Sequence, residues 1–64
     1  MNAGLSAHVL LKISECQESL GNSNDALKEL GKALKYRPRY PEGFLKRGEI
    51  YISMNKYEEA IEDL

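Results

Sequence analysis

The stretch from Leu10 to Leu30 reads LLKISECQESLGNSNDALKEL, and the stretch from Phe44 to Leu64 reads FLKRGEIYISMNKYEEAIEDL. The two stretches align without a gap at an offset of 34 residues, the separation of Ala26 from Ala60. The offset also matches polar positions, including Lys12 with Lys46. A fixed period of this length predicts helical repeat units, each burying a face against its neighbour.

Apolar residues at helical spacing predict a first helix from about Ser6 to Leu20 and a second that continues to about Tyr36. Ser6 is a candidate N-cap for the first helix. Gly21 suits the left-handed conformation that ends a helix, and Asn55 holds the same place in the second unit.

Two prolines mark the boundary between the units. Pro38 disfavours a helical conformation at the residue before it and so predicts the end of the second helix. Pro41 fits the first turn of a third helix, where its missing N–H costs nothing. A fourth helix is predicted from Lys56 or Tyr57 to Leu64.

Small residues recur in register. Ser14 and Gly48 are expected to face Ala26 and Ala60, so that the two helices of each unit approach closely. A larger side chain at such a crossing costs about 1–3 kcal/mol through overpacking.

This pattern resembles the tetratricopeptide repeat, a helix–turn–helix unit of the same period. In the second unit, the slots of the family pattern are filled by Phe44, Gly48, Tyr51, Tyr57 and Ala60. In the first unit, they are filled by Leu10, Gly21, Ala26, Ala33 and Pro38. The departures from the pattern are Ser14, Gln17, Ser23 and Arg47.

The resemblance implies an all-α fold of four antiparallel helices in one domain over residues 1–64. It places a first repeat at about 7–40 and an incomplete second repeat at 41–64, and it suggests a fragment of a longer array. It further implies a protein–protein interaction module and scaffold.

Composition excludes some classes of function. The formal net charge is -1, which gives no overall attraction to nucleic acid or to an anionic membrane. No apolar run is long enough for a membrane span, and the N-terminus lacks the pattern of a secretory signal. A single cysteine cannot form an internal disulfide, so the default expectation is an intracellular, cytoplasmic protein.

The sequence offers no catalytic or metal constellation. Cys16 aligns with Ile50, which favours a small buried hydrophobe over a reactive thiol. His8 lies eight residues from Cys16, about 12 Å along a helix and too far for a catalytic pair. We therefore expect no enzyme activity, no cofactor and no metal.

In the family, the first helix of each unit lines a concave groove that binds a peptide or protein. Matching that register gives a candidate groove whose apolar contacts come from Leu11, Leu45 and Ile52. Its acidic character favours a basic or hydrogen-bond-donating ligand. The candidate residues are His8, Leu11, Glu15, Glu18, Ser19, Glu42, Leu45, Glu49, Ile52 and Ser53.

Three further interpretations stay open. Cations interleaved with two tyrosines in Lys32–Tyr40 are an alternative site for RNA or another nucleic acid, although the short run and the net charge favour a helix end packed at a turn. The chain is alternatively a purely structural segment of a longer scaffold. The last helix also predicts a homo-oligomer through an apolar stripe that includes Tyr57, Ile61 and Leu64.

Overall fold

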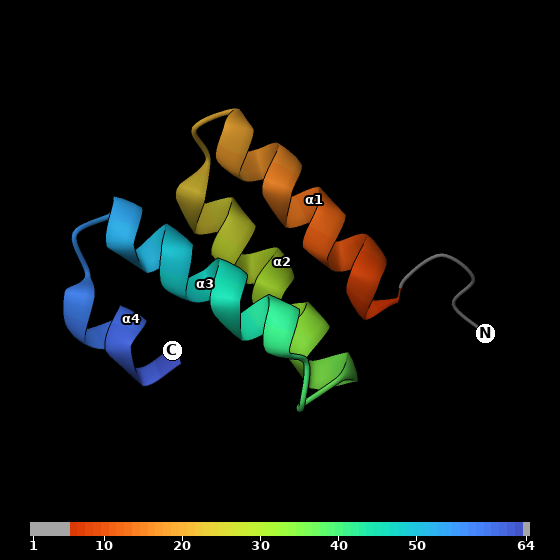
Figure 1. Ribbon diagram of the computed structural model, residues 1–64. Coiled ribbons are helices and arrows are strands. Elements are labelled where there is room, and N and C mark those ends of the chain that lie inside the picture. The colour runs from red at the N-terminus through yellow and green to blue at the C-terminus, as the bar shows by residue number, and fades with distance from the viewer. Residues whose placement is uncertain (1–5, 64) are drawn as a thin grey trace.

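The computed structural model describes residues 6–63, and over this range it contains four helices and no strand. The helices are α1 (Ala7–Ser19), α2 (Ser23–Tyr36), α3 (Pro41–Ser53) and α4 (Tyr57–Asp63). Successive helices reverse direction at short turns (Figure 1). The predicted all-α arrangement of antiparallel helix–turn–helix repeats is confirmed.

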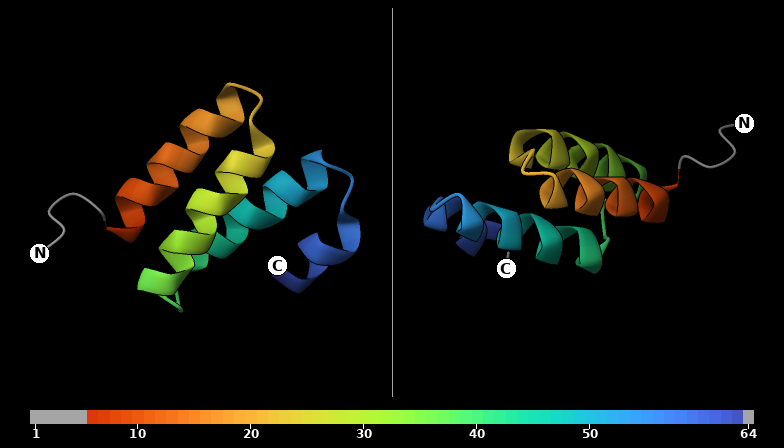
Figure 2. Two further views of the ribbon diagram at one scale, coloured as in Figure 1. Left: turned by 180° about the vertical axis from the view of Figure 1, so that it is seen from behind. Right: turned by 90° about the horizontal axis from the view of Figure 1, so that it is seen from above.

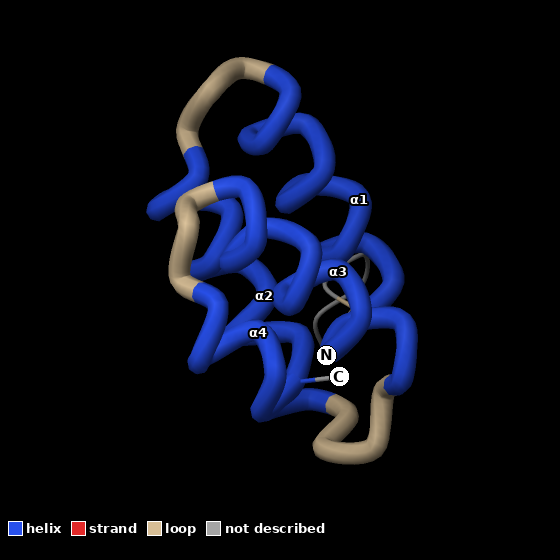
Figure 3. Tube along the Cα trace, turned by 60° about the vertical axis from the view of Figure 1, so that its left-hand side comes forward, coloured by secondary structure: helices blue, strands red, loops and turns tan. Residues whose placement is uncertain are grey.

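The helices form two hairpins stacked in two layers. Viewed from above, the α1–α2 hairpin lies over the α3–α4 hairpin (Figure 2). The two turns within hairpins lie toward one end of the molecule, and the connection from α2 to α3 lies at the opposite end (Figure 3). This is the stacking that a two-unit helical repeat requires.

The turns within the two hairpins have the same backbone structure. Gly21 has a φ of 84° and Asn55 has a φ of 62°, as their sequence positions predicted. The N–H of Asn22 donates to the carbonyl of Gln17, and the N–H of Lys56 donates to the carbonyl of Tyr51, both at 2.8 Å. These bonds satisfy carbonyl groups that a helix end leaves without partners.

The other helix ends also follow the local sequence. The Ser6 hydroxyl accepts a hydrogen bond from the N–H of Val9 at 3.2 Å and caps α1. Helix α2 ends at Tyr36, two residues before Pro38, and α3 begins at Pro41. Helix α4 begins at Tyr57, and the predicted end at Leu64 lies outside the described residues.

Small side chains fill the crossings within each hairpin. Ser14, Gly48, Ala26 and Ala60 are all buried, as predicted. The Ser14 hydroxyl donates to the carbonyl of Leu11 at 2.6 Å, so its polar group is satisfied inside the core. The close approach of the helices therefore carries no unpaired hydroxyl.

The two hairpins meet where α3 packs on α2. A Cβ atom placed on Gly43 would lie 3.0 Å from Cδ2 of Tyr40 and 3.1 Å from Cδ2 of Leu34. Two turns farther along α3, Ile50 is completely buried in the same core cluster as Leu30. The second unit is thus held against the first by a close backbone approach and a buried isoleucine.

The expected burial of Cys16 is wrong. The Cys16 thiol is exposed, whereas Ile50, its counterpart in the second unit, is completely buried. The register is right, but the environments differ because Ile50 packs on the first hairpin. None of the described residues covers the corresponding side of α1.

Candidate partner-binding groove

A groove of about 190 Å³ lies between α1 and α3. Both helices contribute to it because they are the first helices of successive units. Its lining residues are Leu11, Glu15, Glu42, Leu45, Lys46 and Glu49. Five of the ten residues expected to line a groove therefore share one cavity.

The groove has an apolar floor and an exposed apolar side. Leu11 is buried in the core cluster and forms the floor. Leu45 is 53% exposed, so its side chain is accessible to another molecule. Ile52 lies two turns farther along α3 and is also exposed, but outside the cavity itself.

Lys46 links the two helices across the groove. Its Nζ lies 3.4 Å from Oε1 of Glu18 on α1 and 3.4 Å from Oε1 of Glu49 on α3. Burial lowers the pKa of Lys46, but attraction to Glu18 and hydrogen bonds to Glu49 and Glu18 outweigh it and raise that pKa above its ordinary value. The charged ammonium group of Lys46 therefore connects α1 with α3. The other charged side chains that line the groove are carboxylates.

The remaining expected residues are dispersed. His8 is exposed on α1, and Ser19 lines a separate shallow hollow with Cys16 and Leu20. The Ser53 hydroxyl donates to the carbonyl of Ile50 at 2.6 Å. Neither serine lines the groove.

Sequence reasoning missed Lys46 as a groove residue. Lys46 precedes Glu49 by three residues, and this spacing on a helix favours an ion pair that the sequence could have predicted. The contact of Lys46 with Glu18 joins residues 28 positions apart in the sequence, and no local sequence pattern predicts it.

Arg47 departs from the family pattern for a visible reason. Its Nε and its second terminal nitrogen donate to the two carboxylate oxygens of Asp63 at 2.7 and 2.8 Å. The Asp63 side chain is only 6% exposed. The hydrogen bond to Asp63 raises the pKa of Arg47 in spite of burial. The guanidinium carbon also lies 5.4 Å from the centre of the Phe44 ring. This pair fastens α4 to α3.

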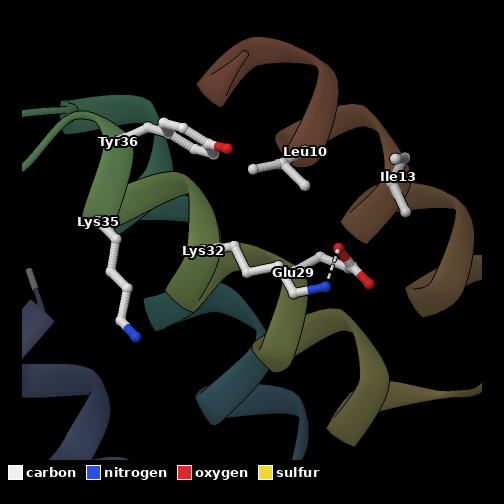
Figure 4. A pocket seen from close by; sticks show the side chains of 6 residues that line it. All are labelled: Leu10, Ile13, Glu29, Lys32, Lys35 and Tyr36. Atoms are coloured by element: carbon white, nitrogen blue, oxygen red, sulfur yellow. Dashed lines mark ion pairs between the residues drawn. The ribbon is translucent and has the colours of Figure 1, made fainter. Parts of the chain in front are cut away.

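A second cavity, of about 330 Å³, lies on α1 and α2 outside the groove. Leu10 and Ile13 face it from α1, and Tyr36 extends its ring toward α1 (Figure 4). Two lysines border it from α2. Lys32 pairs there with Glu29 at 3.6 Å (Figure 4). The sequence did not predict this cavity, although Lys32 and Tyr36 share one helix face.

The basic turn Lys32–Tyr40 does not present both its tyrosines. Tyr40 is 4% exposed and belongs to the core cluster. The guanidinium carbon of Arg37 lies 5.2 Å from the centre of the Tyr40 ring. Stacking on a base requires an accessible ring face, and Tyr40 does not offer one.

Among residues 6–63, no group of three or more His, Cys, Asp or Glu side chains is placed to hold a metal ion. Over the same range, no helix is both long enough and apolar enough to cross a membrane.

Two family models described as tetratricopeptide repeat match this chain. One covers residues 8–40 and the other covers residues 41–64. Comparison with curated proteins and comparison with solved structures gave no match. Tetratricopeptide repeats are in general protein-interaction modules built on a non-catalytic scaffold. The two consecutive matches coincide with the two hairpins of the structure, and the chain belongs to the tetratricopeptide repeat family.

Proposed function

We propose that the groove between α1 and α3 binds a protein segment that carries both apolar and basic side chains. The observation behind this proposal is the juxtaposition of exposed Leu45 with the carboxylates of Glu15, Glu42 and Glu49 in one cavity. Leu45 offers apolar area, and the carboxylates favour a ligand with lysine or arginine.

Lys46 supports this choice of ligand charge. Its ammonium group is already paired with Glu18 and Glu49, so the groove has no cation left over for a ligand carboxylate. Glu15 and Glu42 remain at the rim for a basic segment. Glu15 is additionally within 3.5 Å of Lys12, an exposed contact that a ligand cation can replace.

Fluorescence anisotropy with two labelled amphipathic peptides tests this proposal. The peptides share one leucine pattern, with lysine in one and glutamate in the other. We expect the lysine peptide to bind, and we expect Leu45→Ser and Glu49→Lys each to weaken binding at least about tenfold, or 1.4 kcal/mol. Glu58→Lys, an exposed change on α4, is the matched control and should bind as the parent does.

Equal affinity for both peptides, or unchanged affinity in the Leu45 and Glu49 variants, would contradict the groove proposal. A salt-dependent complex with single-stranded RNA that is lost in Arg37→Ala and Lys35→Ala would instead favour the alternative at the basic turn. Absence of any complex would favour a purely structural segment.

We also propose that copies of this chain associate through α4. Tyr57 is 56% exposed and Ile61 is 74% exposed, and both lie on one side of the helix. Association removes this apolar area from water, which is favourable by about 25 cal/mol per Å². Leu64 was expected to extend the stripe and lies outside the described residues. Sedimentation of the parent protein and of Ile61→Asp measures this association.

A further inference from the structure

The side of α1 that faces away from α3 carries an unpartnered apolar surface, which we call the leading face. Its exposed residues are Cys16 and Leu20. The half-buried Val9 and Ile13 border it, and Ile13 also packs against the core. Leu20 is 74% exposed, and Cys16 and Leu20 line the same shallow hollow. The exposed apolar residues Tyr57 and Ile61 on α4 form the trailing face.

The contact between α2 and α3 defines how two units stack. Gly43 on α3 lies against Leu34 on α2, and the two helices run in opposite directions (Figure 1). Seven residues make about two helical turns. Ile50 lies two turns after Gly43 on α3, and Leu27 lies two turns before Leu34 on α2. Because the helices are antiparallel, Ile50 and Leu27 are therefore opposite each other. Ile50 belongs to the core cluster, and Leu27 packs against it.

The repeat offset transfers this contact to the two unpartnered faces. Cys16 stands where Ile50 stands in the other unit, and Ile61 stands where Leu27 stands. The same offset of 34 residues matches Leu20 with Met54 and Tyr57 with Ser23. In the α2–α3 pair, Ser23 is the position opposite Met54. An α1 helix stacked on α4 in this register sets Cys16 opposite Ile61 and Leu20 opposite Tyr57.

We infer that the leading face of one copy receives the trailing face of a second copy, so that molecules stack head to tail in the register of the α2–α3 contact. This inference rests on the proposed association through α4 and specifies the surface that receives it. In this register, Leu20 and Ile61, each 74% exposed, are both covered.

Charge favours a second copy as the occupant. The leading side of the first hairpin carries Lys12, Lys32 and Lys35. Glu15 pairs with Lys12 and Glu29 pairs with Lys32, so Lys35 leaves this side with a net positive charge. Exposed carboxylates border Ile61 at Glu58 and Glu62. Opposite charges on the two ends steer the ends of different molecules together and disfavour contact between two acidic α4 helices, as a two-fold dimer through α4 requires.

Mixing two blocked variants tests this arrangement. Leu20→Glu places a carboxylate on the leading face, and Ile61→Asp places one on the trailing face. Both positions are exposed, so circular dichroism should show that both variants remain folded. In sedimentation velocity at about 1 mM, we expect each variant alone to be a monomer, an equimolar mixture to form dimers and no larger species, and the parent protein to form dimers and larger species.

Oxidation tests the register. In Ile61→Cys, the introduced thiol and Cys16 of the next copy are expected to form a disulfide-linked ladder on a non-reducing gel. The parent protein, with Cys16 alone, and Cys16→Ala combined with Ile61→Cys should each form at least about tenfold less product. Glu59→Cys presents its thiol on the opposite side of α4 and is the matched control.

The possible outcomes separate the two proposals. If Leu20→Glu associates as the parent does, or the mixture stays monomeric while the parent associates, head-to-tail stacking is wrong and association through α4 alone stands. A disulfide-linked dimer of Ile61→Cys that lacks Cys16 would show a two-fold contact and also overturn the inference. A parent protein that is monomeric at this concentration would refute both proposals.

Discussion

At the scale of single residues, Arg47 carries the clearest energetic consequence. Its guanidinium pairs at two points with Asp63, whose carboxylate is almost fully buried. Arg47→Met keeps most of the apolar stem and removes the charge, so Asp63 loses its partner. We expect the free energy of unfolding to fall by about 1–3 kcal/mol, measured by urea denaturation.

The control for this prediction is Lys12→Met, which removes a solvent-exposed pair with Glu15. It should change the free energy of unfolding by less than about 0.5 kcal/mol. An Arg47→Met protein as stable as the Lys12→Met protein would show that the pair with Asp63 contributes nothing to stability.

Two glycines give opposite predictions for the same substitution. Gly31 lies within α2, and a Cβ there would have no neighbour within 4 Å, so Gly31→Ala should stabilise by about 0.5–1 kcal/mol. Gly21 has equally open space but a φ of 84°, so Gly21→Ala should destabilise by about 1 kcal/mol. Thermal unfolding of both variants checks the pair, and shifts of the same sign would contradict the argument.

Lys46 makes the stability depend on pH in the alkaline range. The folded state raises the pKa of Lys46 above its ordinary 10.5. Its stabilising contribution is therefore complete below the ordinary pKa and is lost as the pH rises through the raised value. The stability advantage of the parent over Lys46→Gln should be about 0.5–1 kcal/mol near neutral pH and should shrink above the raised pKa. Urea denaturation at several pH values measures it, and an advantage that grows with alkaline pH would contradict this sign.

At the scale of helices, the crossing within each hairpin depends on small side chains. Ala26 is completely buried where α2 packs on α1, and Ser14 is equally buried on the facing helix. Ala26→Leu should lower the free energy of unfolding by about 1–3 kcal/mol because the added atoms force the helices apart. Urea denaturation measures the change, with Leu27→Met, a volume-conserving change at a neighbouring position, as the control. An unchanged midpoint for Ala26→Leu would mean that the crossing is not tight.

The helices and turns could be predicted because their causes are local. Gly21 and Asn55 end helices through their own backbone preference, and Pro38 and Pro41 act on adjacent residues. The family resemblance gave Leu11, Leu45 and three glutamates as candidate groove residues, and the structure brings these five to one cavity; their binding role stays a prediction. The exposure of Cys16 could not be predicted in this way, because it depends on whether another helix lies against α1. The contact of Lys46 with Glu18 depends likewise on how the two hairpins stack.

At the scale of the whole molecule, the small thickness of the fold limits its free energy of unfolding. The Cα atoms extend 37 × 26 × 13 Å, so a large part of every helix lies near solvent. A chain of this size gains only a small net stability from its core. Its apparent stability should therefore respond to anything that binds the folded state.

The proposed association gives a measurable form of that response. The melting temperature of the parent protein should rise as its concentration increases from about 10 μM to 1 mM, because only the folded state associates. The melting temperature of Ile61→Asp should stay constant over the same range. A parent protein whose melting temperature is independent of concentration would contradict the prediction.

Gly43 has a mechanical consequence for the groove. A methyl group at position 43 would lie 3.0 Å from the ring edge of Tyr40 and 3.1 Å from a methyl group of Leu34, so a neighbouring group must move to admit it. In Gly43→Ala, we expect α3 to shift slightly away from Leu34 on α2, because a tightly packed core accommodates added volume poorly. Leu45 and Glu49 lie on the same helix, so the shift would move them relative to Leu11 and Glu15 on α1. The width of the groove would then depend on a residue that does not line it.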